Sequence, residues 1–438
     1  MNTRVWAWTI IVALGGFLFG FDTAVISGVT DLLREEWSLS NVVLGQVVAA
    51  ALYGTIIGAV FGGVPADRYG RRTSLIGIAL LFLASAIGSA LAPDATTLAV
   101  ARFVGGLGVG ASSVVAPLYI TEVSPAAYRG RLVAAFQFNL VIGILLAYFS
   151  NFAVDAAGLG DNWRLMLGIE ILPAVLFVVL LFRVPRSPRW LITKAGQTEE
   201  ARSVLHLIDP TTADEEVRAI SRAEESEQRV ALGTFFSKKY ARPIVYAFLF
   251  GLFNQVSGIN AVIYYAPDIF QAAGLGRSSA LLSSVGIGVI NVLFTGLGMY
   301  LIDRAGRRRL MYIGTFGYLI SLSAIAYAFY SDSLAGYTVP VWTFVFIASH
   351  AIGQGAVIWV FISEIFTNEV RGLGASLGST SHWIFAAIIG GNFPLLAATF
   401  GNAGVFAFFA CCMVGQLIFV HFFMPETKGK RLERAMPV

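Results

Sequence analysis

Long apolar runs alternate with short polar segments along almost the whole chain. A helix that spans a membrane needs about 20 predominantly apolar residues, and twelve runs reach this length. Their approximate limits are residues 8–29, 43–64, 74–92, 97–120, 132–154, 164–184, 242–271, 279–302, 310–330, 339–363, 373–396 and 403–424. The pattern predicts an all-α membrane protein with twelve transmembrane helices.

One long stretch departs from this pattern, from about Pro185 to Arg242. Its acids and bases lie three or four residues apart, as on exposed helices, and its apolar residues form a thin stripe. The stripe consists of Val204, Leu205, Leu207, Ile208, Val217 and Ile220. We therefore predict an N-terminal six-helix half (1–184), a cytoplasmic linker of short helices (185–241), a C-terminal six-helix half (242–424) and a cytoplasmic tail (425–438).

The two predicted halves share three polar motifs at nearly constant spacing. The paired positions are Asp67 and Asp303 (236 residues apart), Glu122 and Glu364 (242 apart), and Pro185 and Pro425 (240 apart). In both copies of the second motif an arginine follows the glutamate by seven residues. This repeat indicates a parallel duplication, and transporter halves related in this way rock about a site near the membrane midplane.

The repeated motifs place acids and arginines at one edge of the membrane. Glycine permits a tight turn in the first motif, and the arginine fork matches a carboxylate. The predicted network comprises Asp67, Arg68, Arg71, Arg72, Glu122, Arg129, Asp303, Arg304, Arg307, Glu364 and Arg371. We expect cross-helix ion pairs that stabilise the outward-facing state, because these residues lie where an inner gate must close.

Composition and charge agree with a polytopic membrane protein. Hydrophobic residues make up 57% of the chain and charged residues only 13%, whereas a soluble domain carries about 25% charged residues. With both termini cytoplasmic, 26 of the 30 Lys and Arg residues lie inside, the exceptions being Arg34, Arg102, Arg164 and Arg277. This asymmetry follows the positive-inside rule. The compact ends favour a bacterial inner (plasma) membrane.

Other classes of function lack their usual signals. The net charge of +4 suggests no nucleic-acid partner, so the expected partners are a small solute and the lipid bilayer. Cys411 and Cys412 are adjacent and the four histidines are scattered, so we expect no metal and no cofactor. No nucleophile–base arrangement or phosphate-binding loop is present in the sequence, so an enzyme is not expected.

Five further motifs stand out along the chain: Gly20–Gly28, Arg102–Gly106, Pro117–Tyr119, Val256–Asn260 followed by Tyr264 and Tyr265, and Pro425–Gly429. Together they resemble the motifs of the sugar porters within the major facilitator superfamily. The resemblance runs nearly the whole length and implies twelve helices that alternate access. The chain departs from the family pattern at Asn254, Arg186, Ala356 and His382, where the family usually has glutamine, glutamate, proline and an amide.

Polar residues within the predicted spans are candidates for the solute site, because such residues are costly unless they are buried or face a cavity. Amides offer donors and acceptors to a sugar ring, and an indole can cover its apolar face. The resemblance implies substrate contacts for Gln137, Asn254, Gln255, Asn260, Asn291, Trp359 and His382. The alternative is that each amide bonds a neighbouring helix and holds the bundle together.

Two ionisable residues, Asp22 and Arg102, also lie within predicted spans. The resemblance implies that their helices are neighbours, and proton-coupled members have an acid at the Asp22 position whereas passive members commonly have an amide. We predict a proton-coupling pair, with protons as the co-substrate; a static ion pair is the alternative. Glu170 is a third ionisable residue within a predicted span and has no assigned role, and His350 is expected to be a core residue.

The expected function is symport of protons with a neutral, glucose-like monosaccharide, either a hexose or a pentose. A facilitative uniporter is the nearest alternative, and a sugar sensor or a multidrug exporter are more distant ones. We expect the protein to work as a monomer.

Overall fold

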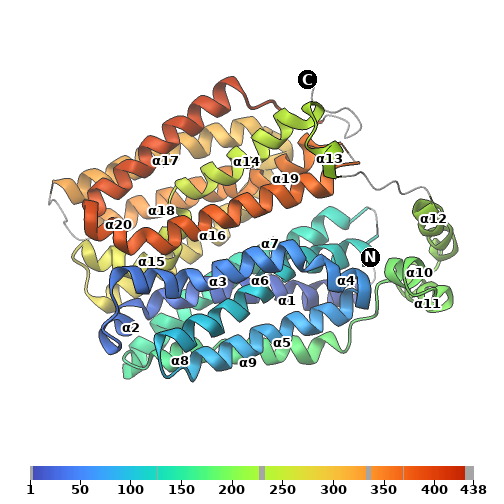
Figure 1. The fold of residues 1–438 in the computed structure, drawn as a ribbon, viewed down its shortest axis with the longest axis horizontal. Coiled ribbons are helices and arrows are strands. Elements are labelled where there is room, and N and C mark those ends of the chain that lie inside the picture. Colours follow the sequence, from blue (N-terminus) through green and yellow to red (C-terminus); the bar gives the residue numbers. More distant parts are fainter. Residues whose placement is uncertain (1–2, 126, 226–231, 332–336, 368, 430–438) are drawn as a thin grey trace. The chain divides into compact units, whose positions relative to one another are not determined.

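A computed structural model of the chain describes residues 3–125, 127–225, 232–331, 337–367 and 369–429. The described residues form helices and no β-strand (Figure 1). Parts of the predicted linker (226–231) and tail (430–438) lie outside them. Among the described residues, eleven helical segments are long and apolar enough to cross a membrane.

The helix α20, Arg371–Phe422, accounts for the difference between eleven segments and twelve predicted spans. It contains 52 residues, which at about 1.5 Å each is more than twice the length needed for a hydrocarbon core of about 30 Å. Its backbone is non-helical at Gly401, with φ 69° and ψ 161°. Gly401 lies between the predicted spans 373–396 and 403–424. The chain therefore crosses twice within α20, and the twelve-helix fold is confirmed.

The chain forms two compact units. Unit 1 contains Met1–Asp22, Tyr53–Ile144 and Leu167–Arg229. Its main helices are parts or all of α1 (Thr3–Val25), α3 (Asn41–Phe61), α4 (Gly63–Tyr69), α5 (Arg71–Ala90), α6 (Ala95–Val123), α7 (Arg129–Val154), α8 (Trp163–Gly168) and α9 (Ile171–Leu181). Within it α5 packs against α6 and α9.

Glycines allow α3 and α6 to approach closely within unit 1. A Cβ atom at Gly54 would lie 2.1 Å from the Phe103 carbonyl oxygen, and one at Gly58 would lie 2.3 Å from that of Leu107. Gly110 of α6 faces the Thr55 carbonyl oxygen in the same way, at 2.2 Å. The small residues thus serve helix contact, as their spacing suggests.

The first part of the predicted linker forms three short helices within unit 1. They are α10 (Pro188–Thr193), α11 (Thr198–Ile208) and α12 (Ala213–Glu225). Leu205, Ala213 and Val217 form their small core, so the predicted amphipathic helices are present. Leu207 is an exception to the predicted stripe, because it is 38% exposed.

Unit 2 contains Thr23–Leu52, Leu145–Met166 and Val230–Val438. Besides the remaining parts of the helices named above, it holds η1 (Ile26–Gly28), α2 (Thr30–Glu36), η2 (Asp155–Leu159), α13 (Leu232–Phe235), η3 (Lys238–Tyr240), α14 (Ala241–Val256), α15 (Ile259–Ala272), α16 (Arg277–Ala305), α17 (Arg307–Tyr330), α18 (Thr338–His350), η4 (Ala351–Gly355), α19 (Ala356–Ile365) and α20. The helices α14 and α17 both pack against α20. The stacked rings of Phe250 and Phe361, with centroids 4.5 Å apart, lie in the core of this unit.

Three local breaks shape unit 2. Gly258, at φ +86°, separates α14 from α15. Pro267 lies inside α15, and Tyr265, two residues before it, is non-helical (φ −127°, ψ 23°), so α15 is kinked there. The segment before α19 lacks the usual proline, as its sequence predicts, but the π-helical turn η4 takes its place. Such turns are a recognised cause of helix kinks.

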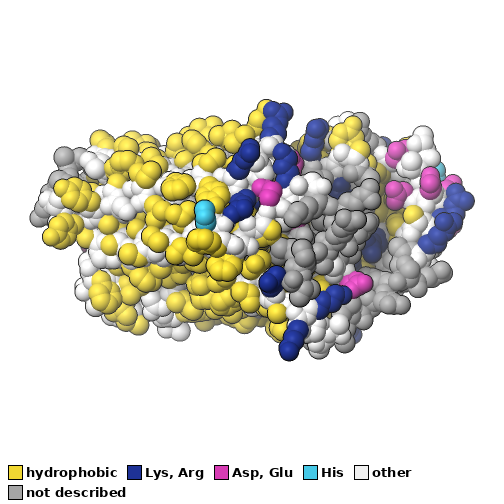
Figure 2. Space-filling view, turned by 90° about the horizontal axis from the view of Figure 1, so that it is seen from above, with side chains coloured by type: hydrophobic (Ala, Val, Ile, Leu, Met, Phe, Trp, Pro, Cys, Tyr) yellow, Lys and Arg dark blue, Asp and Glu magenta, His cyan; other side chains and the backbone are white. Residues whose placement is uncertain are grey.

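Large apolar side chains remain exposed on the spanning helices, as lipid contact requires. Examples are Leu172 (73%), Leu293 (61%) and Ile320 (57%). In the space-filling view apolar side chains cover the left part of the visible face, and Lys and Arg side chains gather further to the right (Figure 2). This separation agrees with a lipid-facing belt that ends at a basic edge.

Candidate transport site

Asp22 and Arg102 form an ion pair inside unit 1. The Arg102 Nη1 atom lies 3.3 Å from Asp22 Oδ1, and Nη2 donates to the Asp22 backbone oxygen at 3.1 Å. The two residues are only 2% and 1% exposed. The predicted proximity of the two helices is therefore present, while the role of the pair in coupling stays a prediction.

Other polar groups surround this pair. Glu170 is 3% exposed, interacts electrostatically with both Asp22 and Arg102, and has one buried oxygen, Oε1, without a partner among the described residues. The Ser85 hydroxyl is also buried and unbonded there. A Cβ atom at Gly105 would lie 2.4 Å from Ser85 Oγ and 3.4 Å from Asp22 Oδ1. Gly105 thus lets α5, α6 and the end of α1 meet around the carboxylate.

The arrangement can support proton exchange. A buried carboxylate is tolerated while a guanidinium neutralises it, and separation of the two leaves a charge whose burial is costly. Binding a proton removes that cost. Sequence reasoning missed Ser85, since a single serine in an apolar run carries no distinguishing signal.

The polar residues of α14 form a second cluster with α19 and α20 in unit 2. Gln255 Nε2 donates to Asn254 Oδ1 at 3.1 Å and lies 3.2 Å from both ring nitrogens of His382. The His382 and Trp359 rings have centroids 5.2 Å apart. The structure therefore brings Asn254, Gln255, His382 and Trp359 together.

This cluster retains free capacity to bind a polar solute. Gln255 Oε1 is buried and accepts no hydrogen bond from the described residues. Trp359 is 39% exposed even though it is large and apolar. A buried acceptor beside an exposed indole suits a sugar, which offers hydroxyl donors and an apolar ring face.

The other residues predicted to contact the sugar do not take part in the hydrogen bonds described for Gln255. Asn291 of α16 accepts from Thr295 Oγ1 at 3.3 Å. Asn260, 9% exposed, lies in the first turn of α15, just after the break at Gly258. Gln137 is half-buried on α7 in unit 1. His350 is bonded through Nδ1 to the Tyr318 hydroxyl at 2.5 Å, as a core histidine would be.

The acid–arginine motif of unit 1 is built around Arg71. Its Nε atom lies 3.1 Å from both oxygens of Glu122, and Nη1 donates to the Ala66 carbonyl oxygen and to Asp67 Oδ1, each at 3.0 Å. Glu122 also accepts from the Ser187 hydroxyl at 2.5 Å. Gly70 makes the turn at φ +90° and lies under the Trp190 ring.

The same constellation recurs around Arg307 in unit 2. Its Nε and Nη2 atoms donate to Glu364 at 3.0 and 2.6 Å, and Nη1 donates to the Ile302 carbonyl oxygen at 3.0 Å. Glu364 accepts from the Thr427 hydroxyl at 2.6 Å. Asp303 is again the outer partner, at 3.2 Å.

The sequence analysis did not identify Ser187 and Thr427, whose hydroxyl groups donate to Glu122 and Glu364. They are 240 residues apart, the same spacing as Pro185 and Pro425, so the repeat contained the signal. The second arginines are also equivalent, since Arg72 donates to the Leu181 carbonyl oxygen at 3.3 Å and Arg308 to that of Val420 at 3.1 Å.

Other members of the predicted network have different surroundings. Arg129 is exposed and joins none of the ion pairs among the described residues, although it follows Glu122 by seven positions. Arg371 donates to the Ser363 carbonyl oxygen at 2.9 Å. Arg68 and Arg304 lie over the rings of Tyr69 and Tyr300, at 5.3 and 4.0 Å. The gating role of the network stays a prediction.

Arg186, which replaces the usual acid, pairs with Glu200 of α11. The departure at Arg186 thus forms an ion pair within the predicted linker. Among the described residues no group of three or more His, Cys, Asp or Glu side chains could hold a metal ion.

The fold and these two sites define a polytopic membrane transporter. The chain belongs to the family described as sugar (and other) transporters, whose profile matches residues 8–438. The predicted family is thereby confirmed, and with it a transporter rather than an enzyme.

Individual relatives resemble the chain over almost its full length. It is 39% identical to the arabinose-proton symporter of Bacillus subtilis (strain 168), covering 96% of this chain and 92% of that protein. It is 36% identical to the D-xylose-proton symporter of Escherichia coli (strain K12), covering 99% and 96%. A structure of the xylose transporter XylE from E. coli, in a partially occluded inward open conformation, matches with a TM-score of 0.87 and 33% identity, over 98% of this chain and 100% of that one.

Proposed function

We propose that the protein is a proton-coupled symporter of a neutral monosaccharide, with Asp22 as the residue that carries the proton. The observation that carries this proposal is the buried ion pair between Asp22 and Arg102. A passive carrier of a neutral sugar needs no ionisable pair in its core, where charge is costly. The names of the relatives, arabinose-proton and D-xylose-proton symporter, support the same function.

The coupling can be derived from the electrostatics of the pair. While Arg102 is close, the Asp22 carboxylate is neutralised without a proton. When the halves rock, the pair separates or loses water, and Asp22 binds a proton because desolvation disfavours its charge. Sugar transport is tied to the proton if the sugar-loaded carrier with a charged Asp22 does not turn over.

The substrate we propose is a pentose, with D-xylose and L-arabinose as the first candidates and a glucose-like hexose as the next. The cluster of Asn254, Gln255, His382 and Trp359 offers neutral hydrogen-bonding groups and one indole, which favours an uncharged sugar over a charged or wholly apolar solute. Gln137, Asn260 and Asn291 are proposed as further contacts.

We further propose that the two six-helix halves alternate access as a monomer, in a bacterial inner membrane with both termini cytoplasmic. The Arg71 and Arg307 constellations would then lie at the inner gate. The positive-inside distribution of Lys and Arg supports this orientation. Protons are the only co-substrate we propose.

Uptake by purified protein in proteoliposomes tests the proposal. Labelled D-xylose should accumulate above its external concentration when a proton gradient is imposed, and unlabelled L-arabinose should compete. Equilibration without accumulation would instead support the facilitative uniporter. Sugar binding without uptake would support the sensor.

A further inference from the structure

Two carboxyl groups from distant parts of the chain line one small cavity in unit 2. Asp31 belongs to α2 and Asp268 lies near the end of α15, one turn beyond the kink at Tyr265. The side chains of Thr30, Gln271 and Arg277 line the same cavity. The cavity is narrow, with an empty volume of about 180 Å³.

The two carboxyl groups are not equally supplied with donors. Asp31 accepts from Arg34 Nη1 at 3.1 Å and from Gln271 Nε2 at 2.8 Å, so both of its oxygens are bonded. Asp268 Oδ1 accepts from the Thr30 hydroxyl at 2.8 Å. Asp268 Oδ2 is buried and has no donor among the described residues, although the Asp31 carboxyl group lines the same small cavity.

A proton on Asp268 would give its Oδ2 atom a bonding partner and would remove one of two neighbouring negative charges. Two charged carboxylates that line one small cavity repel each other, and neighbouring carboxyl groups commonly share one proton. The proton turns Asp268 into a donor toward Asp31, which also accepts from Arg34. We propose that Asp268 and Asp31 form an outer latch, a proton-dependent hydrogen bond that holds the predicted external end of unit 2 closed.

Few other charged or titratable groups face Asp268. Arg34 and Asp31 come from α2, Arg277 from α16, and Tyr265 from α15 itself. The Tyr265 hydroxyl donates to the Gly390 carbonyl oxygen of α20 at 3.1 Å, and His350 of α18 is bonded to Tyr318 instead. Asp31 is thus the group whose hydrogen bonding depends most on whether Asp268 carries a proton.

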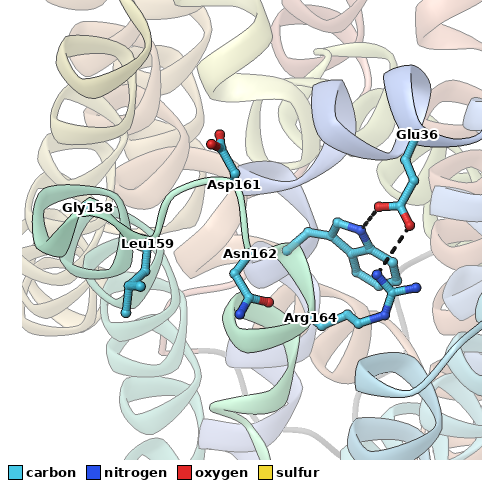
Figure 3. A pocket seen from close by; sticks show the side chains of 7 residues that line it. Glu36, Gly158, Leu159, Asp161, Asn162 and Arg164 are labelled. Carbon is cyan, nitrogen blue, oxygen red and sulfur yellow. Dashed lines mark hydrogen bonds and ion pairs between the residues drawn. The ribbon is translucent and has the colours of Figure 1, made fainter.

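The latch joins α2 to α15, and other bonds hold α2 and the neighbouring α16 in place. Glu36, at the end of α2, accepts from Trp163 Nε1 and from Arg164 Nη1, the latter at 3.2 Å, beside an open pocket (Figure 3). Arg277, at the start of α16, lies 3.4 Å from Asp155 Oδ1 and donates to the Gly28 and Gly160 carbonyl oxygens at 3.3 and 3.2 Å. Separating α15 and α16 from α2 must therefore break the latch.

Over one transport cycle the latch releases one proton and takes one up again, so it adds no net proton movement. On opening, the hydrogen bond between Asp268 and Asp31 breaks, Asp268 becomes hydrated and releases its proton to the external solution. On closing, it takes one proton back from the same side. The latch therefore makes opening depend on external pH without adding a transported proton, and it goes beyond the proposed function because it does not involve Asp22.

External labelling of Leu281→Cys tests the latch, since Leu281 is 2% exposed and lines the cavity. The chain should lack Cys411 and Cys412, and a membrane-impermeant thiol reagent should be applied to right-side-out vesicles at about pH 5.5 and about pH 8. Rates should be normalised to exposed Ala272→Cys, which corrects for thiol ionisation. We expect slower labelling at the lower pH, by on the order of tenfold, because protons bind the closed state more tightly than the open one.

Asp268→Asn separates the latch from other causes. Its amide donates to Asp31 at every pH, so labelling of Leu281→Cys should be slow at both pH values. Asp31→Asn, a second variant if the first does not reach the membrane, should also lose the pH dependence. Asp94→Asn, an exposed acid at the start of α6, should keep it.

Two results would overturn the latch: normalised labelling that does not depend on external pH, or a pH dependence that survives in both Asp268→Asn and Asp31→Asn. The same assay in the Asp22→Asn background keeps the two proposals apart. The latch predicts an unchanged pH dependence there, whatever that variant does to proton coupling.

Discussion

Arg307 binds both oxygens of Glu364, with Nε 3.0 Å from Oε2 and Nη2 2.6 Å from Oε1. Arg71 and Glu122 repeat this relationship 236 and 242 residues earlier, and a hydroxyl completes the carboxylate in each unit. Bidentate pairing of arginine with a carboxylate fixes geometry as well as charge. The two constellations are therefore equivalent anchors rather than incidental surface pairs.

The anchors should contribute to stability in proportion to their burial. Glu364→Gln keeps the shape of the side chain but removes its charge from Arg307, and the two side chains are only 17% and 9% exposed. We expect a loss of about 2 kcal/mol in the free energy of unfolding, with a similar loss for Glu122→Gln. Thermal unfolding in detergent measures it.

Asp303→Asn is the matched control for this prediction. Asp303 contacts the same arginine, but its side chain is 80% exposed, so its removal should change stability little. Equal effects of Glu364→Gln and Asp303→Asn would contradict the assignment of Glu364 as the anchor.

The sugar site can be distinguished from amides that merely join helices. Gln255→Ala removes a side chain whose Oε1 atom has no donor among the described residues, so sugar binding should weaken about tenfold, equivalent to about 1.4 kcal/mol. Gln137→Ala should act in the same direction. Binding can be measured by titration of purified protein with D-xylose.

Gln416 provides the control amide. It accepts from Gln354 at 3.0 Å and donates to Thr315 at 2.6 Å, and it is 1% exposed. Its bonds are satisfied within the protein, so Gln416→Ala should lower the thermal stability and leave the affinity of folded protein near normal. A normal affinity in Gln137→Ala and Gln255→Ala would indicate that these amides are structural.

Sequence patterns predicted the membrane spans and the glutamates and arginines of the anchors. They did not predict which of these side chains pair with each other. Apolar runs are long, and even the break at Gly401 coincides with the gap between two of them. Glu122 precedes Arg129 by seven positions, yet the ion pair is with Arg71, because the packing of α5 on α6 decides which arginine reaches the carboxylate. Asp31 and Asp268 show the limit more clearly. They are 237 residues apart, and no local pattern joins them.

Because the side chains around Asp22 are closely packed, we expect a single methyl group added at Gly105 to reduce transport strongly. Gly105→Ala would place its Cβ atom 2.4 Å from Ser85 Oγ, so α6 must move away from α5 and from the carboxylate. We expect proton-driven accumulation to fall at least several-fold, with a shifted pH profile. Gly77→Ala, on α5 with open space around it, should transport normally; an equal loss there would show that any added methyl group harms the bundle.

Glu426 should stabilise unit 2 in a pH-dependent way. Burial raises the pKa of Glu426, but backbone N–H donors, among them those of Arg307 and Arg308 at the start of α17, outweigh it and hold the pKa below its ordinary value of 4.5. Since the folded-state pKa is the lower one, the stabilisation is complete above about pH 4.5 and is lost as the pH falls through the folded-state value. Glu426→Gln should lose about 1 kcal/mol of stability near neutral pH.

The difference in melting temperature between Glu426→Gln and the unchanged protein should shrink as the pH falls below about 4. Asp161→Asn, an exposed acid outside this cap, serves as the control. A difference that stays constant with pH would mean that the charge of Glu426 does not contribute through these backbone donors.

Asp22→Asn tests the central claim most directly, because the amide resembles the protonated acid in shape but cannot titrate. Accumulation of labelled sugar under an imposed proton gradient and exchange of labelled for unlabelled sugar should be measured in the same proteoliposomes. We predict that accumulation and sugar-induced proton uptake are lost while exchange continues, because exchange requires no proton cycle. If Asp22→Asn still concentrates sugar when a proton gradient is imposed, Asp22 is not the coupling residue.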